Sequence, residues 1–160
     1  MQLVMDADAL IKLTRCGAKE AVVDAFEVVI PPTVRHEAAQ EQFPDGAAIA
    51  ANLAAGRIRV VTASGGPSEL GILPPGGERE VYVLGVSHPH ARIVSDDRKF
   101  TRRLAMLGLT AQTPATVLVA LRVRGWASQQ EVIGWLEALR PLVSREEYAA
   151  ARGELAAGGQ

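Results

Sequence analysis

Acidic side chains directly follow two apolar segments of this chain. Asp6 and Asp8 come after an apolar run that begins at Leu3, and Asp96 and Asp97 come after a second such run. Short apolar runs predict buried strands, and Asp is a poor residue for a strand interior. In a parallel sheet the carboxyl ends of the strands open onto one edge, where α/β proteins place their ligands. We therefore expect these four carboxylates to gather at one edge of a sheet.

Two glutamates are expected near the same edge. Glu37 lies in the first turns of a helix expected after Pro32. Its apolar neighbours place it beside the apolar face of that helix, where an unpaired charge is costly. Glu78 opens a later helix, although an acid at a helix start is also an ordinary partner of the helix dipole. Asp8 has a comparable alternative, as the N-cap of the helix that follows it.

Acids that converge without a matching set of Lys or Arg repel one another unless a cation, a proton or solvent separates them. Carboxylate oxygens are hard ligands, and they favour Mg²⁺ or Mn²⁺ over Zn²⁺. Metal sites of this type polarise a phosphodiester oxygen, activate water and stabilise the leaving oxygen. The residues alone therefore predict a metal-dependent phosphoryl-transfer or hydrolase site.

Strand and helix patterns alternate along the chain, which predicts a parallel, helix-covered sheet, an α/β/α sandwich in three layers. After the opening strand, further strands are expected at 27–30, 57–61, 91–95 and 109–111. Residues 1–160 are expected to form a single domain, with the helices of about 113–155 packed on the core. Thr113 and the pairs Ser128/Glu131 and Ser144/Glu147 predict the starts of these helices. The Gly- and Pro-rich segment 64–77 is either a mobile flap or a linker.

The composition excludes several other classes of protein. The chain has 160 residues, of which 48% are hydrophobic and 4% aromatic, with a net charge of −1. A folded domain is expected, without an aromatic platform for stacking bases or an overall basic field. Cys16 is the only cysteine, which rules out an intramolecular disulfide and a Cys-rich zinc site. No apolar segment is long enough for a membrane helix and no leader is evident, so we expect a cytoplasmic protein.

The acidic pattern resembles the PIN domain, a small metal-dependent ribonuclease fold shared by VapC-type toxins. The resemblance covers about residues 2–113 and rests on acids in the family's order, each in its strand or helix context. It points to Asp6 after the first strand, to Glu37 after a strand and prolines, and to Glu78 in a Gly-Glu sequence. The fourth place falls to Asp96 or Asp97, which the sequence does not separate. Asp8 and Glu80 are expected to support the site, and Glu80 is also the second choice for the third acid.

The resemblance implies a Mg²⁺- or Mn²⁺-dependent endoribonuclease that cuts RNA. It also implies a homodimer, and it raises the toxin half of a toxin–antitoxin pair, with an antitoxin protein as partner. The alternative is a PIN-like module that binds RNA or protein without cutting. A phosphoacceptor domain is disfavoured because it needs a Lys late in the chain, and the last Lys is Lys99.

Basic residues flank the acidic edge, and they have two possible roles. They either bind RNA phosphates beside the metal or form a solvated helix face. Hard cations seldom recruit imidazole, so the histidines are expected at the surface rather than in the site. The basic candidates are Lys12, Arg98, Lys99 and Arg102, with Arg103 beside them, and the histidines are His36, His88 and His90.

Overall fold

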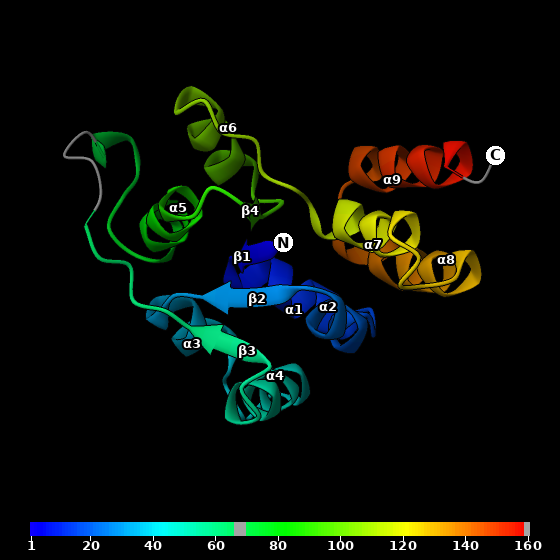
Figure 1. The fold of residues 1–160 in the computed structure, drawn as a ribbon, viewed down its shortest axis with the longest axis horizontal. Coiled ribbons are helices and arrows are strands. Elements are labelled where there is room, and N and C mark those ends of the chain that lie inside the picture. Colours follow the sequence, from blue (N-terminus) through cyan, green and yellow to red (C-terminus); the bar gives the residue numbers. More distant parts are fainter. Residues whose placement is uncertain (66–69, 159–160) are drawn as a thin grey trace.

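The structure is a computed structural model that describes residues 1–65 and 70–158. Its strands are β1 (Gln2–Met5), β2 (Glu27–Ile30), β3 (Ile58–Val60) and β4 (Ala91–Val94). The sheet has the order β3–β2–β1–β4, and neighbouring strands are parallel (Figure 1). Helices cover both faces of the sheet, which confirms the predicted three-layer α/β/α fold. Residues 66–69 of the Gly- and Pro-rich segment lie outside the described residues.

The helices follow the strands in the expected alternation. They are α1 (Ala7–Arg15), α2 (Lys19–Ala25), α3 (Pro32–Ala38), α4 (Pro44–Ala54), α5 (Gly77–Ser87), α6 (Arg98–Met106), α7 (Pro114–Val123), α8 (Gln129–Leu139) and α9 (Arg145–Ala157). Short 3-10 turns lie at Leu70–Ile72 and Arg140–Leu142. None of the helices within the described ranges combines the length and apolar character that a membrane crossing requires.

The central strand β1 is apolar because helices cover it on both faces. Leu3, Val4 and Met5 have no exposed surface. Val4 is aligned with Val29 of β2 on one side and with Ile93 of β4 on the other. The carboxyl end of β1 therefore lies between those of β2 and β4, and the segments that follow these three strands share one edge of the sheet.

The predicted strand at 109–111 is wrong. The structure has only an isolated bridge there, between Gln112 and Val94. The amide of Gln112 donates to the carbonyl of Ile93 at 2.8 Å, and its carbonyl accepts from the amide of Ser95 at 2.9 Å. Thr113 caps α7 immediately afterwards, so the chain turns into a helix before a ladder can extend.

The C-terminal helices pack against the first helices of the chain. Helix α7 contacts α1 and α2, and α8 and α9 pack on α7. The predicted helix starts at Thr113 and Ser128 are confirmed, because each hydroxyl accepts a hydrogen bond from the third residue of its helix. The buried apolar residues of α7, α8 and α9 belong to the same cluster as those of the sheet.

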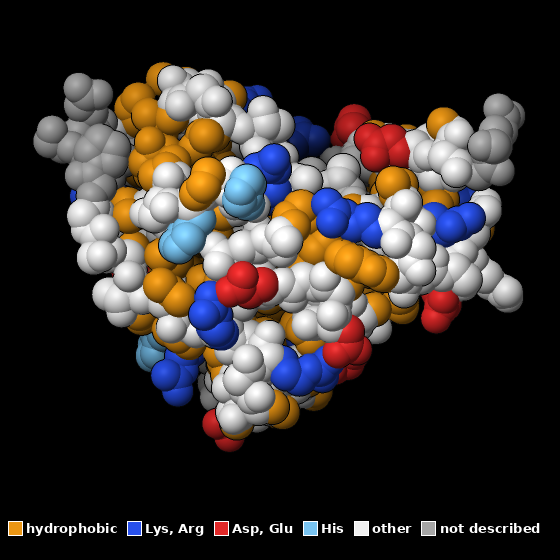
Figure 2. All heavy atoms as spheres, in the orientation of Figure 1, with side chains coloured by type: hydrophobic (Ala, Val, Ile, Leu, Met, Phe, Trp, Pro, Cys, Tyr) orange, Lys and Arg blue, Asp and Glu red, His pale blue; other side chains and the backbone are white. Residues whose placement is uncertain are grey.

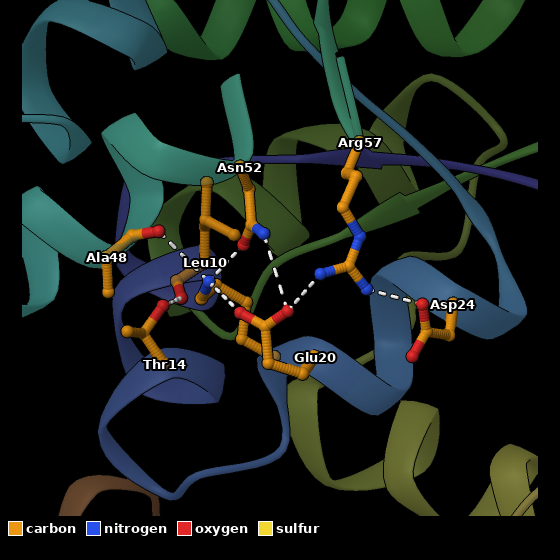
Figure 3. Close-up of polar contacts among 8 residues, drawn as sticks. Leu10, Thr14, Glu20, Asp24, Ala48, Asn52 and Arg57 are labelled. Atoms are coloured by element: carbon orange, nitrogen blue, oxygen red, sulfur yellow. Dashed lines mark hydrogen bonds and ion pairs between the residues drawn. The ribbon is translucent and has the colours of Figure 1, made fainter. Parts of the chain in front are cut away.

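A buried lysine joins two helices near the amino ends of the strands, at the edge of the sheet opposite to the predicted acidic site. Lys19 begins α2 and is 5% exposed. Its ammonium donates to the carbonyl of Ala48 at 3.0 Å and to the side chains of Asn52 and Glu20. Figure 3 shows Arg57 completing this network by bridging Glu20 and Asp24. The network ties α2 to α4, and its acids are paired with cations far from the carboxyl edge.

Gly85 sets the distance between α5 and β4. A Cβ at Gly85 would lie 2.5 Å from Cγ1 and 2.6 Å from Cδ1 of Ile93, closer than real carbon contacts allow. Gly134 in α8 has open space at the same position. Gly134→Ala is expected to stabilise the protein by about 0.5–1 kcal/mol through helix propensity. Gly85→Ala should be less stable than Gly134→Ala by about 1–3 kcal/mol because of overpacking.

Thermal and urea denaturation of both variants would check this prediction. Ile93→Val removes Cδ1, so Gly85→Ala should cost less in an Ile93→Val background, and the two substitutions should not be additive. Equal stability changes at the two glycines, or strict additivity with Ile93→Val, would show that α5 does not need this close approach.

Candidate functional site

Asp6 directly follows β1 and caps α1. Its Oδ1 accepts a hydrogen bond from the amide of Ala9 at 2.8 Å. The prediction that Asp8 is the cap is therefore wrong, since the helix begins two residues earlier and Asp8 lies in its first turn. Burial raises the pKa of Asp6 to about 6, against the opposing hydrogen bonds of Ser95 and Ala9, while the charges of Asp96 and Asp8 raise it further. Asp6 is thus an acid whose negative charge the fold does not fully compensate.

The structure separates the two acids after β4. Asp97 caps α6, and its Oδ1 accepts from the amides of Lys99 and Phe100, both at 2.8 Å. Asp96 turns towards α1, where its Oδ2 accepts from the ammonium of Lys12 at 2.6 Å. Its Oδ1 is buried and has no hydrogen-bond partner among the described residues. Asp97 therefore lies on the solvent side of the carboxyl edge of the sheet, and the Asp96 carboxylate points towards α1 in the interior.

Lys12 joins two acids that are distant in sequence. Its ammonium lies 2.7 Å from Asp8 Oδ2, one helical turn away, and 2.6 Å from Asp96 Oδ2. The side chains of Lys12 and Asp96 are 16% and 8% exposed. Burial alone would lower the pKa of Lys12, but the bonds to Asp8 and Asp96 outweigh it and raise the pKa. Lys12 is thus a charged clamp between the turn after β1 and the turn after β4.

The glutamates of α3 and α5 have different surroundings. Glu37 is exposed, so the prediction that it lies beside the apolar face is wrong. Its Oε1 lies 3.9 Å from where a Cβ on Gly77 would be, which places its carboxylate near the first turn of α5. Glu78, in that turn, accepts from Arg103 Nη1 at 2.7 Å. Glu80 instead accepts from the hydroxyl of Thr33 at 2.8 Å and fastens α5 to α3.

A cavity of about 390 Å³ opens at this edge of the sheet. Acids that follow two strands and acids from three helices line it, together with the chain just before α5. The acids are Asp6, Asp8, Glu37, Glu78 and Asp97, and the other lining residues are Ala7, Thr33, Val34, Pro74, Pro75, Gly76, Gly77 and Phe100. Part of the Gly- and Pro-rich segment is therefore a wall of the site. The expected residues Asp96 and Glu80 are not among the described lining residues.

The lining acids match a divalent cation in chemical type. Every titratable side chain in the lining is a carboxylate, the donor that Mg²⁺ and Mn²⁺ prefer. Asp6, whose pKa is about 6, would gain from a nearby positive charge. In the side-chain positions seen here, no three acidic, histidine or cysteine residues of the described ranges converge closely enough to hold an ion. Binding a cation would therefore require side chains to move.

Two cations already neutralise part of this edge. Lys12 pairs with Asp8 and Asp96, and Arg103 pairs with Glu78. The expectation of acids without matching Lys or Arg is therefore wrong for these residues. Asp6, Glu37 and Asp97 line the cavity and have no ion pair within the described parts of the chain, although backbone amides bind Asp6 and Asp97.

Some of the expected phosphate-binding residues are held in ion pairs within the protein, and others are not. Lys12 is held by two carboxylates, and Arg98 of α6 lies 3.5 Å from Glu146 of α9. Lys99 and Arg102 are exposed on α6, and no ion pair involves either of them in the described ranges. Figure 2 shows acidic and basic side chains interspersed over one face, with histidines at the surface. His36, His88 and His90 are all exposed, as predicted.

Sequence reasoning missed Glu147 of α9. Ser144 caps α9 as predicted, but Glu147 does not complete the expected capping box. Its Oε1 instead accepts from the amide of Ala115 in the first turn of α7 at 3.2 Å. Burial raises its pKa, and the charge of Asp96 raises it further. Glu147 therefore lies near the clamp, and its pattern in the sequence indicates only a helix start.

Comparisons with known proteins agree with this architecture. A solved structure of a PilT N-terminus domain protein from the hyperthermophilic archaeon Sulfolobus solfataricus P2 matches with a TM-score of 0.54 and 19% identity, over 75% of this chain and 92% of that chain. At this identity the likeness concerns the fold alone. No curated protein is significantly similar to this chain. The family model described as DUF3368: PIN domain matches residues 2–154, and the chain therefore belongs to this PIN-domain family.

Proposed function

We propose that this protein is an endoribonuclease that depends on Mg²⁺ or Mn²⁺. The observation that carries the proposal is the cavity at the carboxyl edge of the sheet, which five acids line. PIN domains are in general nucleases. Asp6, Glu37, Glu78 and Asp97 are the residues that would hold the metal, which when bound activates water and stabilises the leaving oxygen.

The chain's own residues position the RNA and support the acids. Asp97 and Asp6 each cap a helix, so their carboxylates are fixed relative to the backbone. Lys12 holds Asp96 on the side of α1. The capping bonds of Asp97 hold its carboxylate where it lines the cavity. Lys99 and Arg102 are exposed on α6, and we expect them to bind RNA phosphates.

A cleavage assay on RNA with both ends blocked tests the proposal, because only internal cuts are then detected. The wild type should cleave with Mn²⁺, lose activity with a chelator and recover when Mn²⁺ is restored. Asp97→Asn should reduce the cleavage rate by more than about 100-fold. Mutating a residue that only supports a metal ligand already costs about 10- to 100-fold in metal affinity or activity, and Asp97 would itself be a ligand. The matched control is Asp24→Asn, because Asp24 lies at the opposite edge of the sheet. Intact RNA under all metal conditions would contradict the proposal.

One observation favours the alternative of a module that binds RNA or protein without cutting. Three of the acids are already paired, Asp8 and Asp96 with Lys12 and Glu78 with Arg103. The described side chains also do not converge on an ion. Calorimetric titration with Mn²⁺ discriminates the two functions, because the nuclease must bind the ion. The partners implied by the family resemblance, a second copy of the chain and an antitoxin, stay predictions.

A further inference from the structure

Arg103 is a basic residue with a direct contact to an acid that lines the cavity. It lies on α6, and its Nη1 donates to Glu78 Oε2 on α5 at 2.7 Å. Both side chains are 33% exposed, so solvent reaches the pair and either partner can rotate away. Arg103 itself is not among the described residues that line the cavity. The pair therefore draws the Glu78 carboxylate towards α6.

A divalent cation in the cavity would conflict with this pair. Glu78 cannot give its full charge to both a guanidinium and a metal ion, and the two cations repel each other across a few ångströms. Asp6 and Asp97 have no such competitor, since their hydrogen-bond partners are backbone amides and, for Asp6, also the uncharged side chain of Ser95. Glu78 is thus the cavity acid whose availability to a metal depends on an arginine.

The released arginine would have a nearby alternative. Arg98, Lys99 and Arg102 are exposed on the same helix, so RNA that binds along α6 places phosphates close to Arg103. A planar guanidinium binds a phosphate with two parallel hydrogen bonds, as it does a carboxylate. A phosphate can therefore replace Glu78 without leaving Arg103 unpaired.

We propose that Arg103 is an exchangeable counter-ion of Glu78, which a divalent cation displaces and an RNA phosphate then binds. This inference rests on the proposed metal-dependent function. Its consequence is a positive coupling between metal and RNA: each ligand favours the state in which Arg103 has left Glu78, so each raises the affinity for the other by the same factor.

Calorimetric titration with Mn²⁺ in the absence of RNA tests the first half. Arg103→Met should bind Mn²⁺ about 3- to 10-fold more tightly than the wild type, because a part-exposed ion pair no longer has to break. Arg102→Met is the matched control, since it removes the same charge one residue away from the pair; it should change the affinity less than about 2-fold. In a Glu78→Gln background Arg103→Met should give no gain.

The possible outcomes separate the inference from the function on which it rests. If no variant and no wild-type protein binds Mn²⁺, the proposed function fails and the inference fails with it. If the wild type binds Mn²⁺ and Arg103→Met binds it no more tightly than Arg102→Met does, the inference alone is overturned. Arg103→Lys, which keeps a cation for Glu78, should stay within about 2-fold of the wild type and guards against a variant that is simply misfolded.

Fluorescence anisotropy with a labelled RNA tests the second half. Ca²⁺ is used in place of Mn²⁺, and the RNA is confirmed to be intact after each measurement. The wild type should gain RNA affinity on addition of Ca²⁺, and Arg103→Met should lose most of that gain. Arg102→Met should bind RNA more weakly both with and without Ca²⁺, because a phosphate-binding residue is lost, but it should keep the gain that Ca²⁺ gives. An equal gain in all three proteins would overturn the exchange of Arg103 onto phosphate.

Discussion

Asp6→Asn is expected to unfold at a higher temperature than the wild type at neutral pH, although it should lose metal-dependent cleavage. Burial raises the pKa of Asp6 from 3.8 to about 6, so a charged Asp6 costs the folded state up to about 3 kcal/mol without metal. Asn carries no charge and is an equally good N-cap, so the bond to Ala9 is kept. Cleavage should fall by more than about 100-fold, because a metal-binding carboxylate is lost.

The gain in stability should depend on pH with a defined sign. The folded state binds the Asp6 proton more tightly than the unfolded state does, so wild-type stability falls as the pH rises from about 4 to about 6. Asp6→Asn does not titrate at this position. The two proteins should therefore have similar stabilities below about pH 4 and differ fully above about pH 6.

Calorimetric unfolding without metal over this pH range measures the difference. Asp8→Asn is the control, because Asp8 is 60% exposed and pairs with Lys12. Its charge is the smallest of the influences on the pKa of Asp6, so its removal should give little of the gain expected for Asp6→Asn. If Asp6→Asn is less stable than the wild type at neutral pH, the negative charge of Asp6 does not destabilise the folded protein, and this prediction is wrong. Saturating Mn²⁺ should reverse the order, since only the wild type gains stability by binding it.

Lys12→Met should lower the free energy of unfolding by about 2–4 kcal/mol, because removing one partner of a largely buried pair strands the other charge. Asp96 is the stranded partner: its side chain is 8% exposed and its second oxygen is already without a bond in the described structure. Because the pKa of Lys12 is raised above 10.5, its contribution is present throughout the neutral range and is lost only at strongly alkaline pH.

The double variant Lys12→Met/Asp96→Asn isolates this cause. Removing the stranded charge should recover more than half of the stability lost in Lys12→Met, as measured by urea denaturation. Lys99→Met is the control for loss of a lysine and should shift the stability by less than about 0.5 kcal/mol. A small effect of Lys12→Met, or no recovery in the double variant, would mean that water rather than Lys12 compensates Asp96.

The sequence predicted those parts of the fold and site that local patterns encode. An apolar run followed by an acid indicates a strand end, and this placed Asp6 and Asp97 at one edge of a parallel sheet. Local patterns could not show which of two neighbouring acids lines the cavity, because that depends on contacts with residues distant in sequence. Asp96 turns away from the cavity because of Lys12, 84 residues earlier, and Glu80 differs from Glu78 because Thr33 binds it.

Side-chain exposure and charge pairing were the least predictable properties. Helix periodicity placed Glu37 beside an apolar face, but the short α3 leaves it exposed. The strand expected at 109–111 failed because the start of α7 at Pro114 ended the segment. Arg103 was one of several basic residues on a helix, and only the folded chain, in which its side chain reaches α5, identifies Glu78 as its partner.

The strand order has a consequence for when the site comes into existence. β1 pairs with β2 and with β4, and β4 is made long after the other strands. A chain leaving the ribosome can pair β1, β2 and β3 first. It then contains neither Asp97 nor Asp96, the second acid that Lys12 binds. Pairing β4 with β1 also closes a longer loop than pairing β2 with β1 does, and a longer loop costs more conformational entropy. The acidic site is therefore complete only once β4 has been made and has paired with β1, and chains that end before β4 lack it.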